Sequence, residues 1–342
     1  MSMTSRERVL AALACGQPDR VPYCELAIDR ALAQRLMGWG EPQTQAASLE
    51  AQPYTLEEAH AVADALQLDN ICYVLRPPVY ADKLPGQDGR LFYGEGQIRT
   101  LADVERMELP DPDDEALYAE AERFVAGKGQ RALWLVTRLG IFGTMLSLGM
   151  ERFSVALYED RALVERLLDR YTEWTIAVAQ RVCRLGFDVY ASTDDMAFNT
   201  APFFSPRIWR EVVLPRYRRV APYITLPWVI HSDGNILPFV DDLLALGVAG
   251  LHPNEKGAVD IVQMKREYAG RACLLGNVDL VLLGLGTPEE VDAEVRGLIR
   301  DVGPGGGYIV TSGNSLPGYL KVENARALSA AVQRYGQYPL QV

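Results

Sequence analysis

The stretch LPWVIHSDGNILPFVDDLLALGVAGLHPNE, residues 226–255, contains two short apolar runs that each end in polar side chains. The first run, 227–230, has the length and composition of a buried strand and is followed by His-Ser-Asp at 231–233. A helical pattern follows, and a second run at 248–251 ends in His-Pro-Asn-Glu at 252–255. This order predicts a parallel α/β unit, in which chemistry is placed at the carboxyl ends of the strands. The same residues also fit a simple helix cap after a strand, with the histidine only hydrogen-bonded.

The alternation of strand and helix extends through the rest of the chain. Eight short apolar runs are each followed by a helical pattern, at 21–25, 68–75, 132–137, 187–192, 227–230, 248–251, 272–275 and 308–311. The count predicts an α/β fold, a single-domain (β/α)8 TIM barrel over residues 1–342 with an N-terminal helix. Residues 79–112 are rich in Gly, Asp and Pro and are expected to form an insertion after strand two.

An open, doubly wound sheet is the structural alternative, but no glycine fingerprint follows a strand. The glycines at 303–307 precede the last apolar run, so we expect a turn there in preference to a phosphate-binding loop. Local patterns predict helix starts near Thr4 or Ser5 and at Thr55. They also predict a hairpin (90–93 with 97–100), one long helical region (153–184), and helices that begin at Ser205-Pro206 and Thr287-Pro288.

The composition limits the partners of this protein. The 342 residues carry 34 basic and 45 acidic side chains, a formal net charge of −11, which disfavours nucleic acids and anionic membranes as partners. No window approaches the roughly 18 uninterrupted apolar residues of a membrane span, and residues 1–16 lack the apolar core of a signal peptide. The five cysteines are scattered without a CxxC pair, as in a reducing compartment, so we expect a cytoplasmic protein.

Polar side chains that follow the expected strands would converge on one mouth of a barrel. Among them we select as catalytic candidates three carboxylates and one imidazole: Asp194, Asp195, His231 and Glu255. Paired carboxylates suit acid–base work when burial separates their pKa values, although Asp194-Asp195 could equally be a helix cap and a solvated neighbour. A set of His231, Asp233 and Glu255 would give nitrogen and oxygen ligands that suit zinc or another divalent ion.

Other residues near the strand ends are candidates for binding a substrate. Arg76 and Arg138 could hold a carboxylate or phosphate through two parallel hydrogen bonds, or could pair with acidic neighbours. The remaining substrate-binding candidates are polar or aromatic: Tyr23, Phe198, Asn277 and Asn314. Several aromatic residues could line an apolar pocket or belong to the core, namely Tyr23, Tyr73, Trp134, Phe142, Phe198 and Trp228.

Ordered segments along nearly the whole chain resemble the uroporphyrinogen decarboxylase superfamily. The matching segments are TSRERVLAALACGQPDRVP (4–22), STDDMAFNTAPFFSPRIWREVVLPRYRRV (192–220), HSDGNI (231–236), PNEKGAVDIVQMKREYAGRACLLGNVD (253–279), GTPEEV (286–291), PGGGYIVTSGNSLP (304–317) and ENARALSAAVQRYGQYP (323–339). The resemblance implies a (β/α)8 barrel with its site at the C-terminal mouth, and homodimer formation by analogy.

The sequence departs from the decarboxylases of this superfamily at the groups that serve their tetrapyrrole substrate. Residues 23–35 lack the paired-arginine motif, and Arg76 falls near the position of the catalytic aspartate. Asn314 and Met145 fall near the positions of the late histidine and the tyrosine. Decarboxylation of that substrate is therefore not expected.

The other branch contains methyltransferases that act with a corrinoid protein or a thiol. Thiol-methylating members bind zinc through His-x-Cys and a later Cys, where this chain has His231-Ser232-Asp233 and, near the late position, Gly313 or Asn314. The resemblance therefore favours a methyltransferase that moves a methyl group from a small O- or N-methylated substrate to cobalamin on a partner corrinoid protein. The alternatives are a decarboxylase or lyase acting on a tetrapyrrole or small acid, and a non-catalytic protein that binds a tetrapyrrole or corrinoid.

Overall fold

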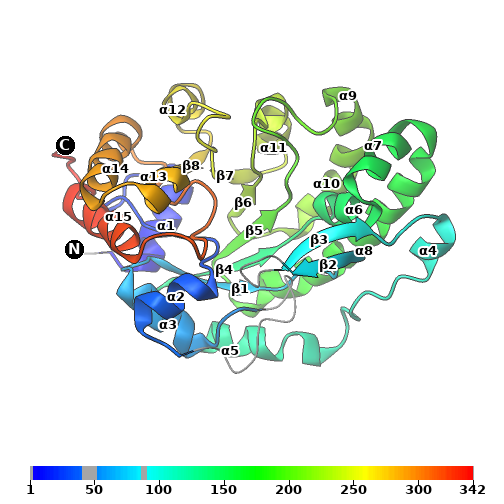
Figure 1. Ribbon diagram of the computed structural model, residues 1–342, viewed down its shortest axis with the longest axis horizontal. Coiled ribbons are helices and arrows are strands. Elements are labelled where there is room, and N and C mark those ends of the chain that lie inside the picture. Colours follow the sequence, from blue (N-terminus) through cyan, green and yellow to red (C-terminus); the bar gives the residue numbers. More distant parts are fainter. Residues whose placement is uncertain (1–2, 41–51, 86–90, 342) are drawn as a thin grey trace.

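The computed structural model describes residues 3–40, 52–85 and 91–341. Its centre is a curled sheet of seven parallel strands in the order β1-β4-β5-β6-β7-β8-β9, in which each strand pairs with the next one along the chain (Figure 1). The strands are β1 (Asn70–Val74), β4 (Ala132–Thr137), β5 (Val189–Thr193), β6 (Trp228–His231), β7 (Val248–His252), β8 (Cys273–Leu275) and β9 (Tyr308–Ile309).

Helices cover the outside of this sheet and one of its ends. They are α1 (Ser5–Leu13), α2 (Arg30–Met37), α3 (Leu56–Ala65), α4 (Leu101–Glu105), η1 (Glu115–Leu117), α5 (Ala119–Gly127), α6 (Ile141–Leu148), α7 (Met150–Glu159), α8 (Arg161–Leu185), α9 (Pro206–Ile208), η2 (Trp209–Val213), α10 (Leu214–Val220), η3 (Ala221–Tyr223), η4 (Leu237–Phe239), α11 (Val240–Ala245), α12 (Ile261–Tyr268), α13 (Leu280–Leu285), α14 (Pro288–Val302) and α15 (Val322–Tyr335). The chain begins and ends on the same side of the molecule (Figure 1).

The gap between the edge strands β1 and β9 is filled by residues 21–25. On one side, Cys24 N–H donates to Val310 and Val310 N–H donates to Pro22, at 3.1 and 2.9 Å. On the other side, the Asp69 N–H donates to the carbonyl of Tyr23 at 2.8 Å. This extended segment takes the eighth place in the ring, so the expected TIM-barrel fold is confirmed.

The expectation of a regular strand at 21–25 was wrong, because this segment makes only an isolated bridge at Tyr23. Pro22 has no N–H to donate, and the Glu25 N–H bonds to the side chain of Asn70 instead of a backbone carbonyl. The Asn70 amide also donates back to the Glu25 carbonyl at 2.9 Å. The Asn70 side chain thus takes the place of a backbone partner in the hydrogen-bond ladder of the sheet.

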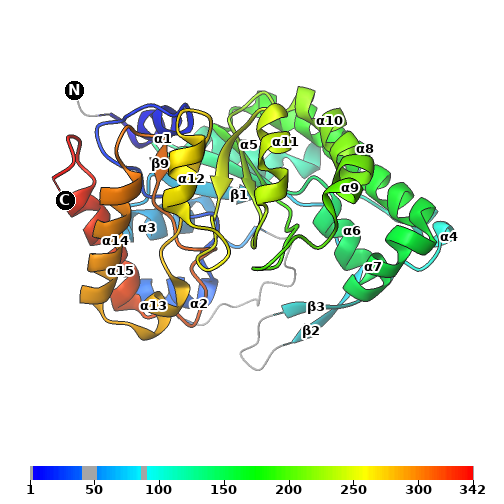
Figure 2. The ribbon, with the colours of Figure 1, turned by 90° about the horizontal axis from the view of Figure 1, so that it is seen from above.

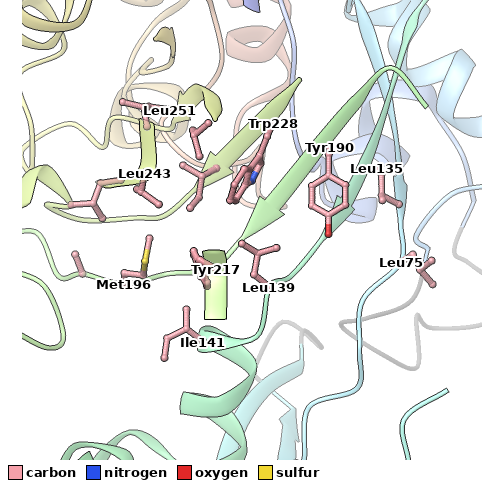
Figure 3. Close-up of a cluster of buried hydrophobic side chains, with 14 of the residues drawn as sticks. Leu75, Leu135, Leu139, Ile141, Tyr190, Met196, Tyr217, Trp228, Leu243 and Leu251 are labelled. Carbon is pink, nitrogen blue, oxygen red and sulfur yellow. The ribbon is translucent and has the colours of Figure 1, made fainter. Parts of the chain in front are cut away.

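Two cores hold the ring of strands between them. Inside the ring, alternate residues of the strands pack with α1, including Trp134, Ala191 and Val229. Outside it, the intervening residues meet the helices, and Figure 3 shows Leu135, Tyr190 and Trp228 of adjacent strands in this outer core. The period of two along each strand therefore decides which core a residue joins.

The insertion after the second expected strand contains the hairpin of β2 (Ala81–Pro85) and β3 (Leu91–Gly96), which projects from the body of the protein (Figure 2). The expected pairing of 90–93 with 97–100 was wrong, and Arg90 lies outside the described residues. Gly96 packs so closely on α6 that a Cβ there would lie 2.2 Å from the Leu148 carbonyl carbon. The chain then leaves the hairpin, and Thr100 caps α4.

Most expected helix boundaries are confirmed. Thr4 and Thr55 cap α1 and α3, each with a glutamate three residues on that completes a capping box. The single helical region expected at 153–184 is divided into α7 and α8, because the chain bends at Asp160, whose side chain caps α8. The glycines at 303–307 form the expected turn into β9, where a Cβ on Gly306 would lie 2.1 Å from the Gly16 oxygen. Within the described ranges, every helix is too short or too polar to cross a membrane.

Candidate active site

An open cavity of about 200 Å³ lies where the strands end. Its polar lining comes from the exits of four strands and one late loop: Arg76, Arg138, Thr193, Asp195, His231, Asp233, Asn314 and Ser315. Leu26, Ala27 and Phe142 add an apolar wall. The cavity therefore occupies the C-terminal mouth of the barrel, where the sequence pattern predicts the site.

The strand register explains why these side chains meet. Val74 is paired with Val136, so two residues further on Arg76 and Arg138 stand opposite each other. Thr193 is paired with His231, and His231 with His252. Because residues two apart on a strand face the same side, this layer continues the inward-facing valines and alanines beneath it.

The same alternation turns Asp194 away from the cavity. Its carboxylate is 0% exposed and accepts the N–H groups of Leu139, Gly140 and Phe142, at 2.6, 3.2 and 3.2 Å. Burial raises the pKa of Asp194, while these N–H groups and Arg138 lower it. Asp194 thus fixes the start of α6, in line with its alternative interpretation as a cap.

Asp195, His231 and Asp233 form a compact cluster in the cavity. The His231 Nε2 lies 3.5 Å from the Asp195 Oδ1 and 3.7 Å from the Asp233 Oδ1. The Asp195 Oδ1 also accepts the Asp233 N–H at 3.0 Å, whereas the Asp233 Oδ1 is buried and has no hydrogen-bond partner in the described part of the chain. These are one nitrogen and two oxygen atoms, all aimed at one small volume.

His252 contacts the cluster through a hydrogen bond to His231. The Nδ1 atoms of His231 and His252 are 2.7 Å apart, so one ring donates and the other accepts. Burial, followed by the charge of His231, holds the pKa of His252 well below its usual value, so this ring is neutral. If His231 donates through Nδ1, its Nε2 keeps a free lone pair toward the two carboxylates.

Two further contacts hold the loop that carries Asp233. The Asn314 amide donates to the Asp233 Oδ2 at 2.5 Å, and the Gly234 N–H donates to the Glu255 Oε2 at 2.7 Å. Burial raises the pKa of Asp233 to about 6, with further increases from Asp195 and Glu255 and decreases from His231 and Asn314. Asp233 is thus a carboxyl group whose proton is exchangeable near neutral pH.

The donor set fits a divalent metal. Bonds of about 2.0–2.2 Å in a tetrahedral zinc site separate neighbouring ligand atoms by roughly 3.3–3.6 Å. The distances from His231 Nε2 to the two carboxylates are close to this range. His231 and Asp233 come together as the metal hypothesis requires, but the third ligand of the group is Asp195 in place of Glu255.

Arg76 and Arg138 also line the cavity. Among the described residues no carboxylate forms an ion pair with either of them, and both Nε atoms lack a hydrogen-bond partner. Arg138 is 4% exposed, with its guanidinium 5.3 Å from the ring centre of Phe142. Burial, and next the charge of Arg138, lowers the pKa of Arg76 to about 10.

Three other candidates lie away from the cavity. Tyr23 faces the outer core and is fully buried. Phe198 is 61% exposed on the loop after β5, with its ring edge-on to that of Phe203. The Asn277 amide is buried and donates to the carbonyl of Asn254 at 2.6 Å. These positions suit packing and loop support better than contact with a molecule in the cavity.

Sequence reasoning did not select His252, Thr193 or Ser315 for the site. The period of two from Val189 onward would have placed Thr193 and Asp195 inward and Asp194 outward. For His252 the signal was its equivalent place at the end of the next strand. No sequence signal points to Ser315, which reaches the cavity from a loop.

The chain is similar to proteins of two named activities. The chain is 25% identical to a uroporphyrinogen decarboxylase of Alkalilimnicola ehrlichii, over 98% of this chain and 95% of that protein. It is 24% identical to a methylcobamide:CoM methyltransferase of Methanosarcina barkeri, over 92% of this chain and 79% of that protein.

Among solved structures, a methyltransferase from Methanosarcina mazei superposes with a TM-score of 0.76 at 21% identity, covering 98% of this chain and 99% of that one. The similarity supports the fold. The family model of uroporphyrinogen decarboxylase (URO-D) matches residues 87–335, well over half of the chain. The protein therefore belongs to the uroporphyrinogen decarboxylase family.

Proposed function

We propose that this protein is a methyltransferase that moves a methyl group from a small O- or N-methylated substrate to the cobalt of a corrinoid held by a partner protein. The observation that carries the proposal is the cluster of Asp195, His231 and Asp233 in the lining of an open cavity, with an Asp233 oxygen that has no partner among the described residues. The similarity to a methylcobamide:CoM methyltransferase supports the same class of reaction.

The chemistry requires help for the leaving group. The methyl carbon forms a bond to reduced cobalt, which supplies both electrons, while the carbon–oxygen or carbon–nitrogen bond breaks and its electrons stay on the departing atom. That atom then needs a proton or a positive neighbour. Asp233, with its pKa raised to about 6 by burial, can deliver a proton at neutral pH, and Asp195 and His231 hold it in place.

Metal binding is the alternative to this proton transfer, because a carboxylate that holds a metal is ionised. A zinc ion held by His231, Asp195 and Asp233 would take over the role of the proton and act as a Lewis acid on the departing oxygen or nitrogen. His252 would then accept the Nδ1 proton of His231 and keep Nε2 turned toward the ion. Asn314 would orient Asp233 through its hydrogen bond to Oδ2, which leaves Oδ1 for the ion.

A thiol acceptor is less consistent with this site. Thiol activation by zinc relies on thiolate-rich ligation in the relatives that this chain resembles. Here the corresponding positions are Asp233 and either Gly313 or Asn314, and none of the five cysteines, all of which are described, lines the cavity. We therefore assign the acceptor role to cobalt and the ligand role to oxygen atoms.

The test is methyl transfer in vitro. The protein is incubated with chemically reduced cobalamin and a panel of methoxylated and N-methylated compounds, and methylcobalamin is followed by its absorbance. We expect formation with at least one donor and a loss of about 100-fold or more for Asp195→Asn, because the leaving group loses its support. An exposed-site variant, Asp301→Asn, serves as the control. If the panel yields no methylcobalamin under any condition, the proposal fails.

A second candidate is decarboxylation of a small carboxylic acid. It is favoured by Arg76 and Arg138, which could hold an acid, and by Asp233, which could protonate the carbon left after carbon dioxide departs. This activity needs no corrinoid. Release of carbon dioxide from a small acid by the protein alone, without methylcobalamin in the assay above, would favour it over methyl transfer.

A further inference from the structure

Arg76 and Arg138 are two like charges placed side by side. They follow β1 and β4, and the register of Val74 with Val136 brings them opposite each other at the cavity. The repulsion is visible in Arg76, whose pKa is lowered by burial and then by Arg138. Arg138 is buried and Arg76 is half-buried. Removing two guanidinium groups from water without a carboxylate between them is costly unless another anion compensates them.

The neighbouring groups compensate them only in part. The charges of Asp194 and Asp195 raise the pKa of Arg76, but neither carboxylate forms an ion pair with it. Arg138 reaches the Tyr93 hydroxyl at 3.5 Å, and its guanidinium lies near the rings of Tyr93 and Phe142. Aromatic faces attract a cation but cannot satisfy the in-plane N–H groups of a guanidinium.

Other buried arginines of this protein are arranged differently. Arg8 and Arg20 are 6% and 8% exposed, and both donate to the carboxylate of Asp69, at 2.7 and 2.9 Å. The chain thus pairs its buried arginines where they serve the fold. The pair at the mouth departs from this pattern at the place where a small molecule can enter.

We propose that Arg76 and Arg138 together bind a carboxylate of the substrate, which makes the substrate a small methylated carboxylic acid. The inference rests on the proposed function for the methyl group and on the arginine pair for the acid. The carboxylate lies between the two guanidinium groups, beside Phe142. The methylated oxygen or nitrogen then reaches across the cavity to Asp195, His231 and Asp233.

The size of the cavity agrees with this substrate class. About 200 Å³ lies below the roughly 300–1,000 Å³ of clefts that enclose drug-sized ligands. A compact acid fits such a space, and a tetrapyrrole with many carboxylates does not. Two arginines on one side also match a single carboxylate with two oxygen atoms.

Binding of matched probes tests the proposal without any methyl transfer. Methoxyacetate and 4-methoxybenzoate are each compared with their uncharged carboxamides by titration calorimetry, in the parent protein and in Arg76→Gln and Arg138→Gln. We expect at least one acid to bind about tenfold or more tightly than its amide, and each variant to abolish that preference. Arg170→Gln is the matched control, since Arg170 also has an unpartnered Nε but lies in a separate surface groove.

The outcomes separate this inference from the proposed function. Equal binding of acid and amide, or no binding of either acid up to about 10 mM, overturns the carboxylate site. Methyl transfer from uncharged donors that persists in Arg138→Gln would also overturn it while leaving the methyltransferase intact. Acid-selective binding that disappears in both variants but survives in Arg170→Gln supports the site even if no methylcobalamin ever forms. Arg138→Lys is the control for misfolding, because it keeps the positive charge and should retain part of the preference for the acid over the amide.

Discussion

The two ends of the barrel differ in whether their buried charged side chains are paired. At the N-terminal end, Asp69 accepts hydrogen bonds from Arg8, Arg20 and the Tyr23 N–H, so its carboxylate is fully engaged. At the C-terminal mouth, two arginines face each other, and among the described residues neither has a carboxylate partner and one oxygen of Asp233 accepts no hydrogen bond. Paired charges hold a fold together, while unpaired ones at a cavity are kept for a ligand.

Asp188 repeats the N-terminal arrangement beneath β5. Its carboxylate receives Arg6 at 2.6 Å, Lys128 at 2.8 Å and the Leu133 N–H at 2.9 Å. The contrast teaches that the two ends can be altered independently: changes at the lower end should act on stability, and changes at the mouth on function.

The largest effect is expected from Asp69→Asn. The change leaves Arg8 and Arg20 buried near a neutral amide and should lower the free energy of unfolding by about 3–5 kcal/mol. Urea denaturation followed by circular dichroism measures it. The exposed pair of Arg300 and Asp301 provides the control, since Asp301→Asn should change stability by no more than about 0.5 kcal/mol. If Asp69→Asn lowered the free energy of unfolding by as little as the control does, the two ends of the barrel would not differ in the way described.

His231→Ala should have the largest effect on function at the mouth. We expect protein purified without chelator to carry near-stoichiometric zinc by plasma mass spectrometry, and the variant to lose it together with about 100-fold of its activity. His252→Ala should weaken zinc binding by about 10–100-fold, since it removes the partner of His231 Nδ1. A parent free of metal would instead assign the cluster to acid–base chemistry alone.

The pH dependence of the free energy of unfolding should reflect the ionisation of the Asp233 carboxyl group. Its pKa rises from 3.8 to about 6 on folding, so the native state holds an extra proton between these values. This contribution to stability is complete below pH 3.8 and is lost as the pH rises through about 6. The shift corresponds to about 3 kcal/mol, which we reduce to about 1–2 kcal/mol because the side chain is 32% exposed.

Urea titrations at several pH values, with chelator present, compare the parent with Asp233→Asn. The difference in unfolding free energy between the two proteins should decline across this pH window, because the asparagine does not titrate. A constant difference would show that Asp233 titrates normally.

The smallest effect is expected from Arg76→Gln. Removing one of two like charges should leave stability unchanged or raise it by about 1 kcal/mol, in contrast to the loss expected for the paired arginines. Differential scanning calorimetry of Arg76→Gln beside Arg20→Gln measures the contrast. A substantial loss of stability in Arg76→Gln would mean that the mouth pair serves the fold as well.

The sequence predicted the barrel and the place of the site because both depend on local patterns. Apolar runs at regular spacing marked the strands, and the residues after Ile230 and Thr193 marked the mouth. The hairpin partners were not predictable in this way, since the position of β3 depends on how closely Gly96 packs on α6. Asp194 faces away from the cavity and Asp195 faces into it because side chains alternate along a strand, and this period of two was already present in the sequence.

Contacts between distant segments could not be read from the chain alone. Asn314 meets Asp233 because a late loop folds over the mouth, and the two histidines meet because β6 and β7 share a register. The choice of Asp195 over Glu255 in the cluster also depends on loop geometry, since the Gly234 N–H engages Glu255.

Helix α1 closes the N-terminal end of the barrel, where Val9, Ala12 and Leu13 pack into the interior core. A molecule that reaches His231 must therefore enter and leave through the C-terminal mouth. A protein-sized acceptor placed over that mouth would block this route for a small donor. Transfer between the two would then follow an obligatory order in steady-state kinetics, with the small donor bound first and its demethylated product released last.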